Sequence, residues 1–267
     1  MMKRFILYIL LGCTLTACED VIELDLDTAP ARLAIDAQLK MNPNESSTQV
    51  IILSLTTGFY TETPNMVTDA LVNIIEVDNS TTHTFVHDTN TPGHYTLAFV
   101  PNFNTNYKLQ ITYDNAVYES SIEQLVPSVP IDNLTQGTET LFGGDEIEVL
   151  VTITDEDNRD DFYIFDFGYN NFLATKDEFY QGNAFTFSYF FDDLDAGDTA
   201  EISVYGADER YFNFMSAVIE QTEEGGDPFK TTPSTVRGNI YNSTNASHYP
   251  MGYFSIGETY SASLLLE

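Results

Sequence analysis

The chain has 267 residues, 43% of them hydrophobic, which is enough for one large or two ordinary domains. Its 10 Lys and Arg against 41 Asp and Glu give a formal net charge of -31 at pH 7. A surface this acidic repels phosphate backbones and anionic lipid headgroups, which argues against nucleic-acid binding and against purely electrostatic membrane attachment.

The first element in the chain is a secretory signal that ends at a cysteine. Lys3 and Arg4 form a basic region, residues 5–11 form a short apolar stretch, and Leu15-Thr16-Ala17 leads into Cys18. The stretch is too short for a transmembrane helix, which needs roughly 20 apolar residues. We expect the leader of residues 1–17 to be removed and Cys18 to carry acyl chains such as palmitate, which anchor the protein. An ordinary secretory signal with a chance cysteine is the alternative.

The folded part of the protein is expected to contain no thiol. The chain has two cysteines, of which Cys13 leaves with the signal and Cys18 is acylated. Disulfides and thiol catalysis are therefore excluded, and stability must come from hydrophobic burial. The 16 Tyr and 19 Phe suit β-sheets.

Residues 18–31 alternate acidic and aliphatic side chains and are predicted to form an acidic tether. Glu19 and Asp20 directly follow the cysteine, a pattern that resembles the signal by which Bacteroidota send lipoproteins to the outer face of the outer membrane. A solvated linker that happens to be acidic is the alternative.

The next segment, residues 32–128, is predicted to be an immunoglobulin-like β-sandwich. Pro92-Gly93 and Asp114-Asn115 mark turns between apolar runs. Six or seven strands in about 100 residues, separated by regular turns, are typical of this fold. The expected strands lie near residues 33–37, 50–55, 70–77, 82–87, 95–99, 107–113 and 117–118.

Two prolines in Val126-Pro127-Ser128-Val129-Pro130 predict a domain boundary. Residues 129–267 are then a second β-rich, sandwich-like domain that carries one amphipathic helix near residues 208–223. The helix is indicated by apolar residues at helical spacing, namely Tyr211, Phe214, Met215, Val218 and Ile219. The fold class is therefore mainly all-β. Strands are expected near residues 147–153, 162–169, 184–191, 200–205, 252–255 and 259–265.

Several segments together resemble a known family. They are Cys18-Glu19-Asp20-Val21-Ile22-Glu23-Leu24-Asp25-Leu26, Leu53-Ser54-Leu55-Thr56, Pro92-Gly93-His94-Tyr95, and the late pattern Pro233…Gly238-Asn239-Ile240…Gly252-Tyr253-Phe254. The chain resembles the Bacteroidota lipoproteins grouped as domain-of-unknown-function family 4249. The resemblance implies a cell-envelope lipoprotein with an N-terminal immunoglobulin-like domain, of a kind commonly encoded beside TonB-dependent outer-membrane transporters. The family has no established catalytic residues to carry over.

Three histidines are a candidate metal site. His83 and His87 face the same side of a predicted strand, and His94 follows the turn. Positions four apart in a strand lie roughly 13 Å from each other, too far to share one ion directly. Exposed hairpin histidines are the alternative, and we favour it.

Two acidic clusters invite a calcium hypothesis. The run Asp155-Glu156-Asp157-Asn158-Arg159-Asp160-Asp161 fails as an EF-hand, because Asp160 replaces the glycine at the sixth position and Arg159 would repel a cation. An irregular calcium site remains as a candidate, with solvated acidic turns as the alternative. The candidate ligands in the second cluster are Asp192, Asp193, Asp195 and Asp198.

Tyr163, Phe165, Phe167 and Tyr169 alternate along one strand. Such a stripe can bind sugars or peptides, but it is more often the core of a sandwich, which we expect here. Asp27-Thr28-Ala29 and Asp198-Thr199-Ala200 resemble the motif at which Bacteroidota O-glycosylate exported proteins, so Thr28 and Thr199 are candidate glycosylation sites.

The sequence contains no catalytic signature: no Gly-x-Ser-x-Gly, no His-Glu-x-x-His and no phosphate-binding glycine loop. We therefore expect no enzyme, no required cofactor, and a lipid-anchored outer-membrane protein that faces the cell exterior. Its expected role is to bind substrate for, or assist, a TonB-dependent barrel. An adhesion or structural module stiffened by calcium is the alternative, and a polysaccharide-acting enzyme is a third.

Overall fold

The chain divides into residues 1–30 and residues 31–267. The computed structural model describes residues 29–43, 48–58, 61, 63–141, 143–168, 170–222 and 235–267. Its strands and its α-helix all lie in the unit 31–267. Among the residues it describes, no helix has both the length and the apolar content needed to cross a membrane.

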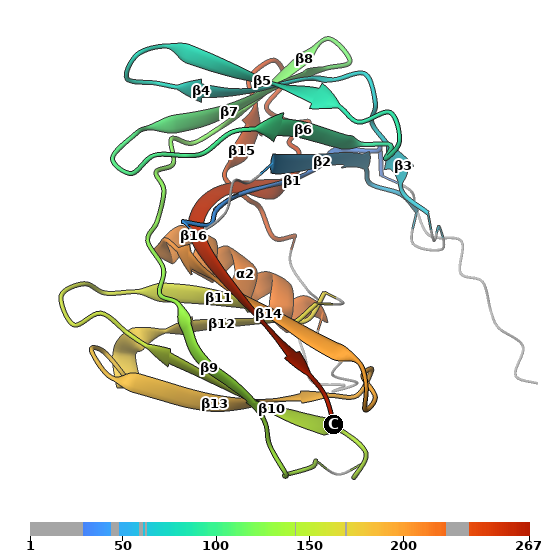
Figure 1. The fold of residues 1–267 in the computed structure, drawn as a ribbon. Coiled ribbons are helices and arrows are strands. Elements are labelled where there is room, and N and C mark those ends of the chain that lie inside the picture. The colour runs from blue at the N-terminus through green and yellow to red at the C-terminus, as the bar shows by residue number, and fades with distance from the viewer. Residues whose placement is uncertain are drawn as a thin grey trace, which may run out of the picture. The chain divides into compact units, whose positions relative to one another are not determined.

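Two layers of strands form the first sandwich (Figure 1). One layer contains β1 (Leu33–Met41), β2 (Thr48–Leu55), β3 (Asn65–Met66) and β6 (His94–Ala98). The other contains β4 (Leu71–Glu76), β7 (Tyr107–Tyr113) and β8 (Ala116–Ser120). β5 (Thr81–His87) joins the layers, because Phe85 pairs with β4 whereas Val86 pairs with β6.

The sequence pattern explains this sandwich. Side chains of β1 alternate, so that Leu33, Ile35 and Leu39 are buried in the core shared by both layers. Asp114 and Asn115 connect β7 to β8 with positive φ at both residues, as a type I′ turn requires. These observations confirm the predicted strands and the hairpin turn.

A second sandwich follows the proline-rich linker. Its first layer contains β9 (Ile131–Gln136), β10 (Ile147–Thr154) and β13 (Ala184–Phe191). Its second layer contains β11 (Phe162–Asp166), β12 (Phe172–Lys176) and β14 (Thr199–Ala207), and a short 3-10 helix, η2 (Asp177–Phe179), follows β12. The hydrophobic core between the layers is rich in aromatic rings.

The only α-helix among the described residues is α2 (Glu209–Thr222), as the apolar spacing predicts. Asp208 caps its N-terminus, because its carboxylate accepts the backbone N–H of Tyr211 at 2.7 Å. Tyr211 and Met215 are buried against β11, β14 and Tyr253, which gives the second sandwich a helical third layer.

The C-terminal strands require a correction to the predicted domain boundary. β15 (Ile240–Asn242) pairs with β8, and the first half of β16 (Met251–Leu265) runs parallel to β1. The second half of β16 pairs with β14, so this one strand belongs to both sandwiches (Figure 1). Residues 240–258 therefore complete the first sandwich rather than a separate domain of residues 129–267. The cause is long-range pairing, which local periodicity does not reveal.

Candidate functional site

The late pattern Gly-Asn-Ile…Gly-Tyr-Phe builds a crossing point of three backbone segments. The side-chain amide of Asn239 makes two hydrogen bonds with the backbone of Phe254, as a paired strand residue would. Its NH2 group donates to the carbonyl of Phe254 at 2.8 Å, and its oxygen accepts the N–H of Phe254 at 2.9 Å. Gly238 lies against the backbone of Gly252, and Gly252 lies against the carbonyl of Ile35, with no room for a β-carbon at either glycine. The motif therefore sets how β16 enters the fold.

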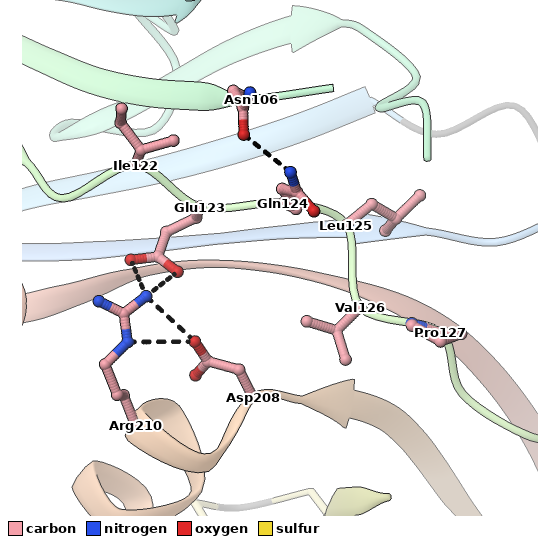
Figure 2. A pocket seen from close by; sticks show the side chains of 9 residues that line it. All are labelled: Asn106, Ile122, Glu123, Gln124, Leu125, Val126, Pro127, Asp208 and Arg210. Atoms are coloured by element: carbon pink, nitrogen blue, oxygen red, sulfur yellow. Dashed lines mark hydrogen bonds and ion pairs between the residues drawn. The ribbon is translucent and has the colours of Figure 1, made fainter. Parts of the chain in front are cut away.

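Asn239 connects this crossing to a charged cluster. Its amide also donates to Glu123 Oε1 at 2.8 Å, and Ser121 Oγ donates to the same oxygen. Glu123 lies in the linker after β8 and is only 7% exposed. Figure 2 shows how Arg210, at the start of α2, reaches both Glu123 and Asp208.

The electrostatics of the cluster follow from burial. Desolvation raises the pKa of Glu123, although hydrogen bonds from Ser121 and Asn239 and the charge of Arg210 oppose the shift. Glu123 is in turn the main cause that raises the pKa of Arg210. Tyr253 lies beside them with its hydroxyl buried and without a hydrogen-bond partner, and burial raises its pKa.

Two hollows flank Arg210. One, of about 470 Å³, lies against the linker and is lined by Asn106, Ile122, Glu123, Val126 and Asp208 (Figure 2). The other, of about 590 Å³, lies over the crossing point. Its lining combines arginine, amide and aromatic side chains, including Arg237, Asn213, Phe214, Tyr241 and Tyr253. Guanidinium groups stay charged and donate from a rigid fork, so this arrangement suits recognition of a ligand rather than proton transfer.

Glu123 should make stability depend on pH. A carboxylate whose pKa is raised by folding costs stability when it is ionised, and that cost disappears once the group is protonated in both states. Between about pH 4.5, the ordinary pKa of a glutamate side chain, and pH 7, the wild type should lose more unfolding free energy than Glu123→Gln. Urea unfolding at both pH values measures this difference.

Glu178→Gln is the matched control, since Glu178 is 51% exposed and its replacement removes the same single charge. If Glu123→Gln and Glu178→Gln change the pH dependence equally, burial of Glu123 does not cause it.

The lipidation and export residues Cys18, Glu19 and Asp20 lie outside the described residues, as does Thr28. Thr199 is described, and it lies exposed at the start of β14. These sites remain predictions.

The three histidines of the candidate metal site have separate partners. His83 contacts Glu76 at 2.8 Å, His87 accepts the N–H of Gly93 at 3.3 Å, and His94 contacts the carbonyl of Pro92. In the part of the chain that the structure describes, no three His, Cys, Asp or Glu residues are placed to hold a metal ion.

The second acidic cluster does not gather into a calcium site either. Asp192, Asp193, Asp195 and Asp198 are exposed, and Asp198 instead accepts the backbone N–H of Asp195 at 2.9 Å. The loop is a hydrogen-bonded turn, as the alternative interpretation predicted.

The first acidic run differs from that alternative, because two of its members are buried. Asp155 is 4% and Asp161 is 5% exposed, and the hydroxyl of Tyr163 contacts both, at 2.5 and 3.0 Å. Arg159 donates to Asp161 at the rim. The interpretation as a solvated turn is wrong here, because partners inside the fold compensate the loss of water.

The aromatic stripe on β11 lies in the core. Tyr163, Phe165 and Phe167 are at most 1% exposed and pack between the two layers, which confirms the core interpretation for them. Tyr169 lies outside the described residues. Sequence reasoning missed the cluster of Glu123, Asn239 and Arg210, although the Gly-Asn-Ile and Gly-Tyr-Phe segments were the signal for it.

Comparison with known proteins gives a family but no function. Residues 19–263 match the family model described as Domain of unknown function (DUF4249). No curated protein matches the chain.

Three solved structures are similar at low identity. A DUF4785 family protein from Legionella pneumophila shares 11% identity over 65% of this chain and 52% of its own, with a TM-score of 0.25. The chain thus spans about half the length of that protein. The chicken interferon gamma receptor alpha chain shares 12% sequence identity over 67% of this chain and 90% of its own, with a TM-score of 0.22. The FN1–FN3 domains of chicken CNTN1 share 9% sequence identity over 62% of this chain and 57% of their own, with a TM-score of 0.20. At these values none of the three matches says anything about function.

Proposed function

Since the chain belongs to the DUF4249 family, as its sequence motifs predict, we propose that it is a surface-exposed outer-membrane lipoprotein of a bacterium of the Bacteroidota. In this role it binds substrate for, or otherwise assists, a TonB-dependent transporter, and it catalyses no reaction. The observation that carries the proposal is the leader, in which a short apolar stretch ends at Cys18 and acidic Glu19 and Asp20 follow.

The physical mechanism is tethering. Acyl chains contribute about 0.8 kcal/mol for each buried methylene, so several chains hold the protein at the membrane. A tether raises the effective concentration of a weak binder near its partner without any new contact. The two hollows beside Arg210 offer a ligand surface of small-molecule size on the anchored body.

The test is affinity capture of the tagged, lipidated protein from its native outer membrane in mild detergent, followed by mass spectrometry. We expect a TonB-dependent barrel in near-stoichiometric amount. Cys18→Ser is the matched control, because it removes the anchor and leaves residues 31–267 intact, and it should recover much less of the barrel.

Surface exposure is measured in parallel by proteolysis of whole cells. An exposed, lipidated protein that is captured without any barrel would overturn the transporter role and favour an independent binding module.

A further inference from the structure

Two arginines stand out because they have no acidic partner among the described residues of a strongly acidic protein. Among the described residues there are seven Lys and Arg, and five of them lie within 4.0 Å of a carboxylate. Arg32 and Arg237 do not, although the whole chain carries a net charge of -31. Since the chain contains 41 Asp and Glu, this placement away from carboxylates needs a physical reason.

Both arginines stack on one tyrosine. The guanidinium carbon of Arg32 lies 3.8 Å, and that of Arg237 lies 3.9 Å, from the ring centre of Tyr249. Such cation–π contacts are attractive, because the face of the ring is negative, and they oppose the repulsion between two like charges placed on one ring. Arg32 also donates to the carbonyls of Tyr249 and Ser247, so its position is held by the backbone.

Arg237 differs from Arg32 in that its guanidinium donates no hydrogen bond to any residue that the structure describes. The described part of the chain offers no hydrogen-bond acceptor to its guanidinium, and the residue is exposed. It lines the hollow of about 590 Å³ together with Arg210. A planar guanidinium with free donors, held over a ring, matches two oxygens of a carboxylate or phosphate.

The aromatic side chains that line the rest of this hollow suit a ligand that contains a ring. Phe214 and Tyr241 line it, and Tyr241 is 48% exposed. Tyr253 lines it as well and is 8% exposed. The volume falls within the roughly 300–1,000 Å³ of small-molecule sites.

We propose that this hollow binds a small ring compound that carries an oxyanion group, with the oxyanion on Arg237 and the ring against Tyr241 and Phe214. The proposal rests on the binding role proposed above and names the ligand class that the role leaves open. A carboxylate and a phosphate present the same chemistry to Arg237, so the ligand can come from sugar acids or from sugar phosphates.

The test uses matched sugars on the purified full-length, lipidated protein in detergent. Glucuronate carries a carboxylate and glucose 6-phosphate carries a phosphate, both on the same kind of sugar ring. Glucose has the ring without an oxyanion, whereas acetate and inorganic phosphate have an oxyanion without the ring. We expect at least one charged sugar to bind with a Kd below 1 mM in calorimetric titration. It should bind at least tenfold more tightly than glucose and than its own ring-free anion.

The variants separate the site from general electrostatics. Arg237→Gln should weaken binding of the charged sugar at least tenfold, and Arg237→Lys, which keeps the charge without the fork, should be intermediate. Lys176→Gln removes one exposed positive charge elsewhere and should leave the affinity unchanged. Each variant should remain folded at the temperature of the titration, which thermal unfolding measured in parallel checks, because Arg237 is exposed and its replacement removes only its contact with Tyr249.

The proposal is overturned if neither charged sugar binds below 1 mM, if glucose binds as tightly, or if Arg237→Gln binds like the wild type. These results are independent of the capture experiment. If the protein captures a barrel but binds neither charged sugar, the proposed transporter role is supported and the proposed ligand class is wrong.

Discussion

Gly252→Ala should lower the free energy of unfolding by about 4 kcal/mol, because two costs add at this position. Its φ of +106° disfavours any residue with a side chain. A β-carbon there would also overlap the carbonyl oxygen of Ile35 in the neighbouring strand β1. Urea or guanidinium unfolding followed by circular dichroism measures the loss.

Gly197→Ala is the matched control for the backbone cost alone. Gly197 has a φ of +99°, and a β-carbon there would meet nothing within 4 Å. We expect it to lose only about 1 kcal/mol. Equal losses for Gly252→Ala and Gly197→Ala would show that the close approach of β16 to β1 is not what requires the glycine.

Tyr163→Phe should lower the free energy of unfolding by about 2–3 kcal/mol at pH 7. Tyr163 is fully buried, and its hydroxyl is the donor that two buried carboxylates share, at 2.5 Å from Asp155 and 3.0 Å from Asp161. Removing the Tyr163 hydroxyl leaves Asp155 without that donor, whereas Arg159 still donates a hydrogen bond to Asp161. Equilibrium unfolding in urea measures the loss.

The part of the loss that comes from the bond between Tyr163 and Asp161 should shrink as the pH falls. Burial raises the pKa of Asp161, so this group accepts a proton more readily in the folded protein and then needs no donated bond. Tyr118→Phe is the control, because Tyr118 is 3% exposed but its hydroxyl has no hydrogen bond within the described residues. A similar loss from Tyr118→Phe would mean that ring packing, not the shared hydrogen bond, determines the cost.

The strands that sequence reasoning found are those with a clear pattern of burial. β1 and β7 alternate apolar and polar side chains, and β10 is a run rich in β-branched residues that is buried at half of its positions. β9 (Ile131–Gln136) and β12 (Phe172–Lys176) were missed, because neither contains a fully buried residue. Half-buried and exposed strands carry little hydrophobic signal for a prediction to use.

The candidate site was harder to predict, because its members are far apart in the chain. Glu123, Arg210 and Asn239 come from a linker, a helix start and a segment before β15. Nothing local marks Glu123 as buried, and a long charged residue in a loop normally faces water. Only the scarcity of Lys and Arg could have pointed to Arg237, as one of 10 cations in 267 residues.

The parallel pairing of β1 with β16 has a mechanical consequence. Ala34 to Met41 pair in register with Met251 to Glu258, and the two strands run in the same direction. A force that pulls residue 33 away from residue 265 therefore acts along the ladder and stretches its hydrogen bonds together, instead of opening them one after another. We expect the protein to resist tension applied between residue 33 and residue 265 more strongly than tension that opens the ladder from one end.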